Sequence, residues 1–179
     1  GVVTSFTTDS GSATPIAGVV QIKASPKHAG SSVSFSGSAN IVLFNVTDAS
    51  NNTIIGLNAG NLAMSGTTNT VLGNAAATAL TNASGNAIVG SSSGSAITTG
   101  ASNTIFGTSS GTSITSGTLN TICGQGSGTG FTTGTRNVIL GTGSGTSFAT
   151  TDSSNIVIGA NVTGTGGQSN SLRIGSGTG

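Results

Sequence analysis

The chain has 179 residues, of which 34% are hydrophobic and only 4% are charged: four Lys or Arg and three Asp or Glu, with one His. Globular domains average about 25% charged residues, so Ser, Thr, Asn and Gly must cover much of this surface. The few charges form no basic stripe of the kind that binds nucleic acid, and no apolar run approaches the roughly 18 residues of a transmembrane helix. We therefore expect neither nucleic-acid binding nor membrane insertion.

Residues 1–50 lack a regular period. Four runs rich in β-branched and aromatic residues, at 2–7, 19–24, 32–36 and 40–46, are separated by Gly, Ser and Pro residues typical of turns. We interpret this segment as a small β cap or docking arm. The end units of repeat proteins differ from the inner ones because they shield the end of the core. An arm would instead add a strand to a neighbouring subunit.

Residues 51–179 repeat a five-residue motif, Asn-Thr-Ile-apolar-Gly. The first asparagines of successive motifs are 17, 17, 17, 17, 17 and 18 residues apart. A degenerate copy at residues 170–175 follows after another 15. The clear copies begin at Asn52, Asn69, Asn86, Asn103, Asn120, Asn137 and Asn155. A constant period is the strongest signal in the chain, because it identifies a repeat architecture.

Each unit continues with a small-residue pair such as Ser110-Gly111, a large apolar residue three positions later, and a turn rich in Thr and Ser. These large residues are Leu80, Ile97, Ile114, Phe131 and Phe148, with Met64 displaced by one position. A repeat of this length is too short for two helices or a strand and a helix, and glycine and β-branched residues disfavour helix.

We therefore predict an all-β fold, a β-solenoid (β-helix or β-roll) of about seven 17-residue coils. Each coil would hold a strand, a glycine corner, a short second strand and a turn. The asparagine that begins each motif is expected to form an amide ladder along the solenoid axis.

The strand motif places two large apolar residues next to each other. Neighbouring side chains of a strand point to opposite faces, so only one of the two can enter a narrow core. The fourth positions would form a second, outward column, which is typical of an interface. This column consists of Ile55, Leu72, Val89, Phe106, Cys123, Leu140 and Ile158. We expect it to mediate self-association into a homotrimer or polymer; the alternative is a column covered by the N-terminal segment.

Residues for catalysis are scarce. Asp9, Asp48 and Asp152 lie in unrelated turns, His28 is the single histidine, and no metal-ligand spacing occurs. A glycine-rich run at 124–130 lacks the Lys-Ser/Thr of a phosphate-binding loop. Cys123 takes a place that is Ile, Leu or Phe in other coils, so we interpret it as a small buried hydrophobic side chain. We expect no enzyme, no catalytic residue, no metal and no cofactor.

The Asn-Thr-Ile-apolar-Gly repeats, with their Ser-Gly pairs and Thr-x-Gly turns, resemble those of phage tail-fibre-like proteins and of trimeric autotransporter adhesin heads. Residues 3–15 and 170–175 resemble segments that flank such repeats, the second one leading into a self-cleaving chaperone in these fibres. The resemblance implies a homotrimeric, extracellular protein on a cell or virion surface, with a role in attachment. One departure is the coil length, because adhesin heads mostly use shorter units.

The leading hypothesis is a structural subunit or stalk of an extracellular fibre or filament. An ice-binding solenoid is one alternative, but it favours a Thr-x-Thr pair in every coil, whereas Thr70, Thr104 and Thr121 are paired with apolar residues. A glycan-binding adhesin directed at a cell-surface receptor is another. Carbohydrate stacks on aromatic side chains, and this chain has six Phe but neither Trp nor Tyr.

Overall fold

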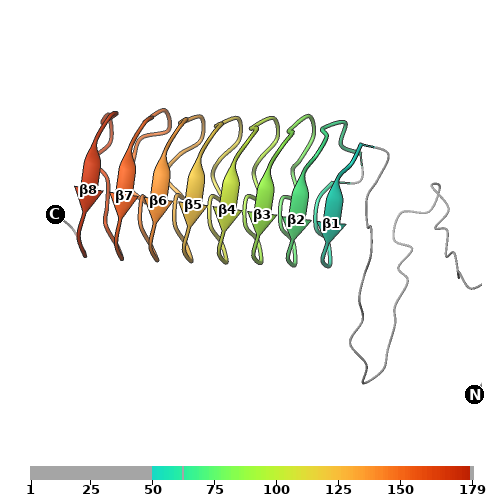
Figure 1. The fold of residues 1–179 in the computed structure, drawn as a ribbon, viewed down its shortest axis with the longest axis horizontal. Coiled ribbons are helices and arrows are strands. Elements are labelled where there is room, and N and C mark those ends of the chain that lie inside the picture. Colours follow the sequence, from blue (N-terminus) through green and yellow to red (C-terminus); the bar gives the residue numbers. More distant parts are fainter. Residues whose placement is uncertain (1–49, 62, 178–179) are drawn as a thin grey trace, which may run out of the picture. The chain divides into compact units, whose positions relative to one another are not determined.

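The computed structural model describes residues 50–61 and 63–177, which form a stack of coils (Figure 1). Each coil contributes one three-residue strand, and the strands form a single parallel sheet in chain order. The strands are β1 (Thr53–Ile55), β2 (Thr70–Leu72), β3 (Ala87–Val89), β4 (Thr104–Phe106), β5 (Thr121–Cys123), β6 (Val138–Leu140), β7 (Ile156–Ile158) and β8 (Leu172–Ile174). The predicted all-β solenoid of about seven coils is confirmed. The cap or arm predicted for residues 1–50 lies, apart from Ser50, outside the described residues.

Each strand pairs with the next at an offset of one repeat. Thr104 lies opposite Thr121 and Ile105 opposite Ile122, an offset of 17 residues. The offset is 18 between β6 and β7 and 16 between β7 and β8. The predicted second strand of each coil is wrong for the described residues, where that part of the coil runs through consecutive turns. The backbone there takes positive φ at two nearby residues, as at Ser109 (53°) and Gly111 (57°), so it is not extended.

Two inner columns of apolar side chains fill the coils. The middle residue of each strand from β2 to β7 is fully buried, as Ile105 and Ile122 are. The second column is the set of large apolar residues that follow the small-residue pairs: Leu80, Ile97, Ile114, Phe131 and Phe148. The Phe131 and Phe148 rings stack with their centroids 5.0 Å apart. These columns form one hydrophobic core that runs through the stack.

The predicted asparagine ladder is confirmed. The Oδ1 atom of Asn103 accepts hydrogen bonds from the backbone N–H and the side-chain amide of Asn120, both at 3.0 Å. The Asn103 amide in turn donates to Asn86 Oδ1 and to the Gly117 carbonyl. Because each amide is buried and its donors and acceptor are used, the ladder joins every coil to the next without an unpaired polar group. Equivalent bonds join Asn52, Asn69, Asn86, Asn103, Asn120, Asn137 and Asn155.

The extra residue between β6 and β7 is absorbed in a turn. The backbone N–H of Asp152 donates to the Ala149 carbonyl, and Asp152 is buried. Its Oδ2 atom accepts from the backbone N–H groups of Ala149 (2.8 Å) and Gly167 (3.1 Å). The Asp152 carbonyl still accepts from the Asn137 amide, so the insertion leaves the ladder intact. This agrees with the prediction that Asp152 is a turn former.

Candidate functional site

The outer face of the sheet is the surface made by the first and last residue of each strand from β1 to β8. Alternation along each strand sends these two side chains away from the core while the middle residue enters it. In β4 this gives a buried Ile105 between an exposed Thr104 and an exposed Phe106. The face is continuous because every strand pairs with its neighbour in register.

The fourth-position column occupies one half of the outer face. Leu72 is 45% exposed and Phe106 57% exposed, and Cys123, Leu140 and Ile158 are exposed as well. Ile55 and Val89 are half-buried. The structure therefore brings all seven predicted residues into one column that is not packed inside the coil. The expectation that Cys123 is buried was wrong, because Cys123 is exposed on this face.

Sequence reasoning missed the apolar end of the outer face. Ile174 continues the column in β8, opposite Ile158, and is 69% exposed. The first strand position, which is threonine in β1, β2, β4 and β5, becomes Val138, Ile156 and Leu172 in the last three strands. Both halves of the face are thus aliphatic over β6–β8. The substitution of Val, Ile and Leu for threonine in the repeats was the signal that could have indicated this.

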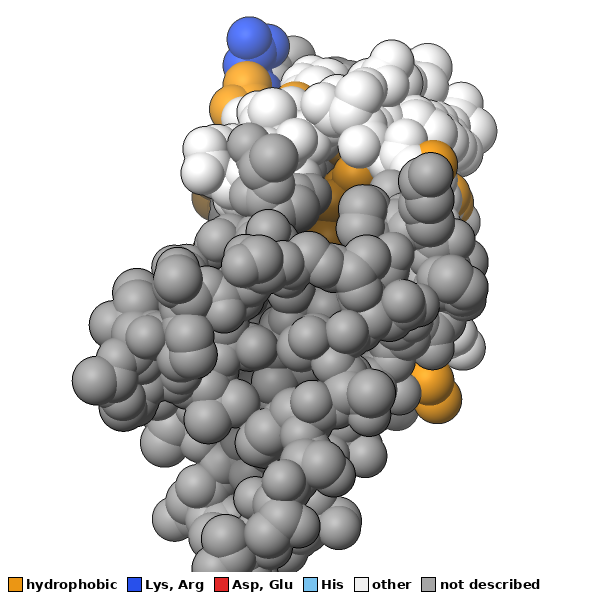
Figure 2. All heavy atoms as spheres, turned by 90° about the vertical axis from the view of Figure 1, so that its right-hand side faces the viewer, with side chains coloured by type: hydrophobic (Ala, Val, Ile, Leu, Met, Phe, Trp, Pro, Cys, Tyr) orange, Lys and Arg blue, Asp and Glu red, His pale blue; other side chains and the backbone are white. Residues whose placement is uncertain are grey.

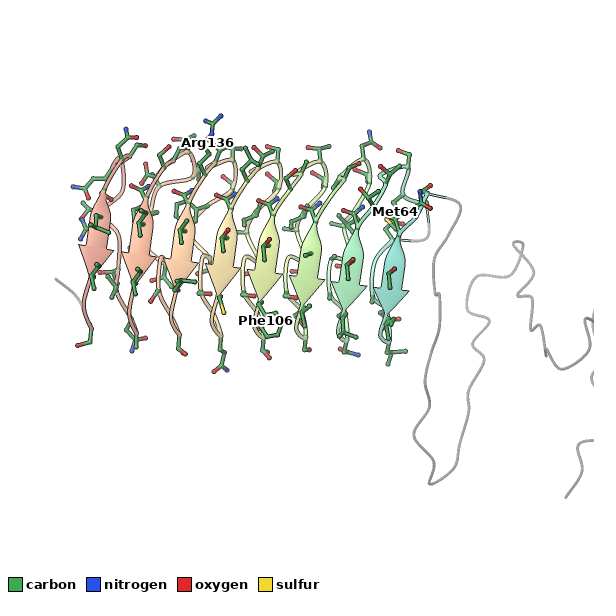
Figure 3. All side chains as sticks on the ribbon, viewed as in Figure 1. Met64, Phe106 and Arg136 are labelled. Atoms are coloured by element: carbon green, nitrogen blue, oxygen red, sulfur yellow. The ribbon has the colours of Figure 1, made fainter. Side chains whose placement is uncertain are left out.

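Charged side chains are absent from the outer face, since no strand begins or ends with Asp, Glu, Lys or Arg. Arg136 extends from the side of the stack where strands begin, whereas Phe106 lies where they end (Figure 3). In Figure 2, which looks along the stack from the β1 end, the described atoms are mostly white, that is, backbone and uncharged polar side chains, with small hydrophobic patches and one small basic area. The face offers hydrophobic contact and threonine hydroxyls, and no charge for an ionic partner.

The described residues contain no cluster of three or more His, Cys, Asp or Glu that could hold a metal ion. Asp9, Asp48 and His28 lie outside the described part of the chain. A hollow of about 250 Å³ lies at the C-terminal end of the stack, lined by β8, the turn after it and Val162. Within residues 50–61 and 63–177 there is also no helix with the length and apolarity needed to cross a bilayer.

No family model matches the chain, and no curated protein or solved structure is significantly similar to it. The features that bear on function are therefore the outer face of the sheet and the asparagine ladder inside the stack.

Proposed function

We propose that this chain is a structural subunit or stalk of an extracellular fibre, whose copies associate side by side through the outer face of the sheet. The observation that carries the proposal is the apolar column along β1–β8, which is exposed at most of its positions. Monomeric proteins seldom leave a continuous apolar strip in water, and such strips mark surfaces that another molecule covers. A second copy supplies the same uncharged strip, so two copies meet without burying a charge.

The interior of the coils suits a part that must withstand mechanical force. Backbone hydrogen bonds, the asparagine ladder and two apolar columns all run from coil to coil. A stack of this kind adds stability with every neighbouring coil, as repeat proteins generally do. The resemblance of the repeats to phage tail fibres and trimeric adhesin heads supports the same role, and with it a location on a cell or virion surface and a part in attachment.

The dimensions of the outer face favour three copies over two. Parallel strands lie about 4.8 Å apart and a residue spans about 3.3 Å, so eight three-residue strands give a strip about 34 Å by 10 Å. Two such strips laid flat bury less than the roughly 800 Å² per partner of a typical stable complex. Around a common axis, each strip and both its flanks are covered by two neighbours. We therefore propose a homotrimer as the building unit.

The test changes two exposed members of the column together, Leu72→Thr and Phe106→Thr. Threonine keeps a high strand propensity, and both positions are exposed in the single chain, so the coil should fold. Loss of two buried apolar side chains removes about 3 kcal/mol or more per copy, which weakens association by about 100-fold or more. Light scattering and negative-stain images measure the mass and the rods.

The matched control is Leu119→Thr. Leu119 is 52% exposed, but it lies at the corner before Asn120, where the equivalent residue two coils earlier is Gly85 and three coils earlier Thr68. The wild type and the control should both form trimers or larger species, and the double variant should be largely monomeric at micromolar concentration. A monomeric wild type, or a double variant that associates like the wild type, would remove the basis of the proposal.

One observation favours ice binding as a second candidate. Threonine occupies the first strand position in β1, β2, β4 and β5, where it is half-buried in β1 and exposed in the other three strands. A regular threonine column on a flat sheet is the feature that orders water. The column is interrupted by Ala87 and ends at Val138, so it spans less of the stack than the apolar column. A measurable thermal hysteresis of the purified protein would support this candidate, and its absence would dismiss it.

A further inference from the structure

The last strand carries a charged residue in the core position. Arg173 is the middle residue of β8 and pairs with Val157, which is fully buried in β7. In the strands before it the same position is Ile or Val. A continued column would place another aliphatic side chain here, so Arg173 interrupts the first inner column at the end of the stack.

The coil before β8 also ends the second inner column. Residues 159–171 contain no counterpart of Phe148 or Phe131, and the backbone of Gly164 lies directly against the Phe148 ring. The Arg173 guanidinium folds back towards this turn, where it donates to Thr165 Oγ1 at 3.2 Å and Gln168 Oε1 at 2.5 Å. Its Nε atom is buried and has no hydrogen-bond partner. Arg173 therefore lies over the end of the core.

A further coil stacked on β8 would remove this guanidinium from water. Burial of an unpaired charge costs several kcal/mol, and a carboxylate is the partner that offsets this cost most strongly. Within residues 50–61 and 63–177 Asp152 is the one acidic residue, and its Oδ2 is already used by Ala149 and Gly167. The repeat itself supplies no acid, because none of its strand positions is Asp or Glu.

β8 nevertheless presents the type of surface to which another strand adds. In the sheet order it has β7 on one side and no described strand on the other. Natural sheets protect such edges with inward-pointing charged residues, because a partner strand would have to bury the charge. Leu172 and Ile174, which flank Arg173, are 65% and 69% exposed, so the rest of this edge strand is apolar.

We propose that Arg173 closes the C-terminal end of the stack against a second copy, and that growth of the assembly by coil-on-coil stacking at this end is blocked. Association is thereby directed to the outer face. The direction of association rests on the proposed function, whereas the closed end is a property of the single chain. The partner that this end excludes is the β1 end of a second copy, whose core position is Ile54.

The experiment compares Arg173→Ile with Arg136→Leu. Arg173→Ile restores the aliphatic column, while Arg136→Leu removes the same charge at an exposed corner where the preceding coil has Leu119. In negative-stain images and sedimentation, Arg173→Ile should give end-to-end rods at least twice the wild-type length. Arg136→Leu and the charge-preserving Arg173→Lys should keep the wild-type length.

Combination with the outer-face variant separates the two proposals. Arg173→Ile together with Leu72→Thr and Phe106→Thr should still elongate, now as rods one chain wide. If the wild type is monomeric but Arg173→Ile elongates, the closed end holds and side-by-side association fails.

Equal rod lengths for folded Arg173→Ile and Arg136→Leu, with circular dichroism confirming the fold, would overturn the closed end. Wild-type rods already joined end to end would overturn it as well. If Arg173→Ile does not fold, Arg173→Gln is used in its place. The rods of Arg173→Gln should also be longer than those of the wild type, but by less.

Discussion

The asparagine that begins each repeat holds the stack together at the scale of single residues. Its side chain is buried, yet every polar atom has a partner in a neighbouring coil or in its own turn. Buried amides are costly when unpaired and specific when paired, because only one register satisfies all of them. The ladder therefore fixes which coil lies on which, a role that the apolar columns alone cannot fill.

Asn103→Ala tests the ladder in the middle of the stack. The change leaves the Gly117 carbonyl and the Asn120 backbone N–H buried without their partners. Each unsatisfied group costs about 1–3 kcal/mol, so the free energy of unfolding should fall by about 2–6 kcal/mol. Urea unfolding followed by circular dichroism measures the loss.

The control for this variant is Thr104→Ala at the next residue. Thr104 is exposed, and the same position is alanine in β3, so the change should stay within about 0.5 kcal/mol. The ladder has no stabilising role if the two variants unfold at the same urea concentration.

Two glycines of one coil differ in how strongly the backbone requires them. Gly124 has a φ of +144°, and a Cβ atom there would overlap the Gly141 carbonyl of the next coil. Gly126 has a φ of +61° with open space around it, and the equivalent residues of other coils include Ala75 and Ser109. The first position needs glycine both for its conformation and for the close approach of coils.

Gly124→Ala should therefore lower the free energy of unfolding by about 3 kcal/mol or more, and Gly126→Ala by about 1 kcal/mol. Both variants make the same chemical change two residues apart, so each is the control for the other. Thermal unfolding monitored by circular dichroism compares them. Equal losses would show that the spacing of coils does not depend on the first glycine of the corner.

At the scale of elements, the strands and their two faces were predictable. A fixed repeat places every motif, and alternation decides that the third residue is inside and the fourth outside. The contrast between buried Ile105 and exposed Phe106 follows directly from that rule. The asparagine ladder was predictable for the same reason, because equal coil lengths bring identical residues into line.

Other elements were not predictable, since they depend on departures from the period. The ladder ends at Ser171, whose backbone N–H and hydroxyl donate to Asn155 Oδ1, and not at the apparent motif start Asn170. Asn170 instead has a φ of 59° at the corner before it. The absence of a second strand could not be predicted either, because Ser109 adopts a positive φ although it is not glycine. The inward Arg173 could be found only once the register of β8 was known.

For the molecule as a whole, the described coils depend on contacts with their neighbours. The two inner columns and the ladder hold neighbouring coils together. The side chains of the outer face, in contrast, are not covered by any other described part of the chain. Its aliphatic character increases towards β6–β8, whereas its N-terminal strands alternate threonine with apolar residues. Two copies match these regions best when their corresponding ends lie together. We therefore propose that copies that associate side by side share one polarity.

Cys123 provides a native probe of the outer face, because it is the single cysteine and lies exposed on β5. The comparison is a Cys123→Ser protein that carries Ser116→Cys, since Ser116 is exposed in a turn away from the sheet. The rate at which each thiol reacts with a chromogenic disulfide reagent, measured at several protein concentrations, reports how accessible that thiol is. Thiolate reactivity requires access, so a covered cysteine reacts slowly.

If copies associate through the outer face, Cys123 should react at least about tenfold more slowly than the cysteine at position 116 once the protein is concentrated enough to assemble. Dilution should remove the difference. A Cys123 thiol that reacts as fast as the control at every concentration, in a protein that is folded, would contradict association through the outer face.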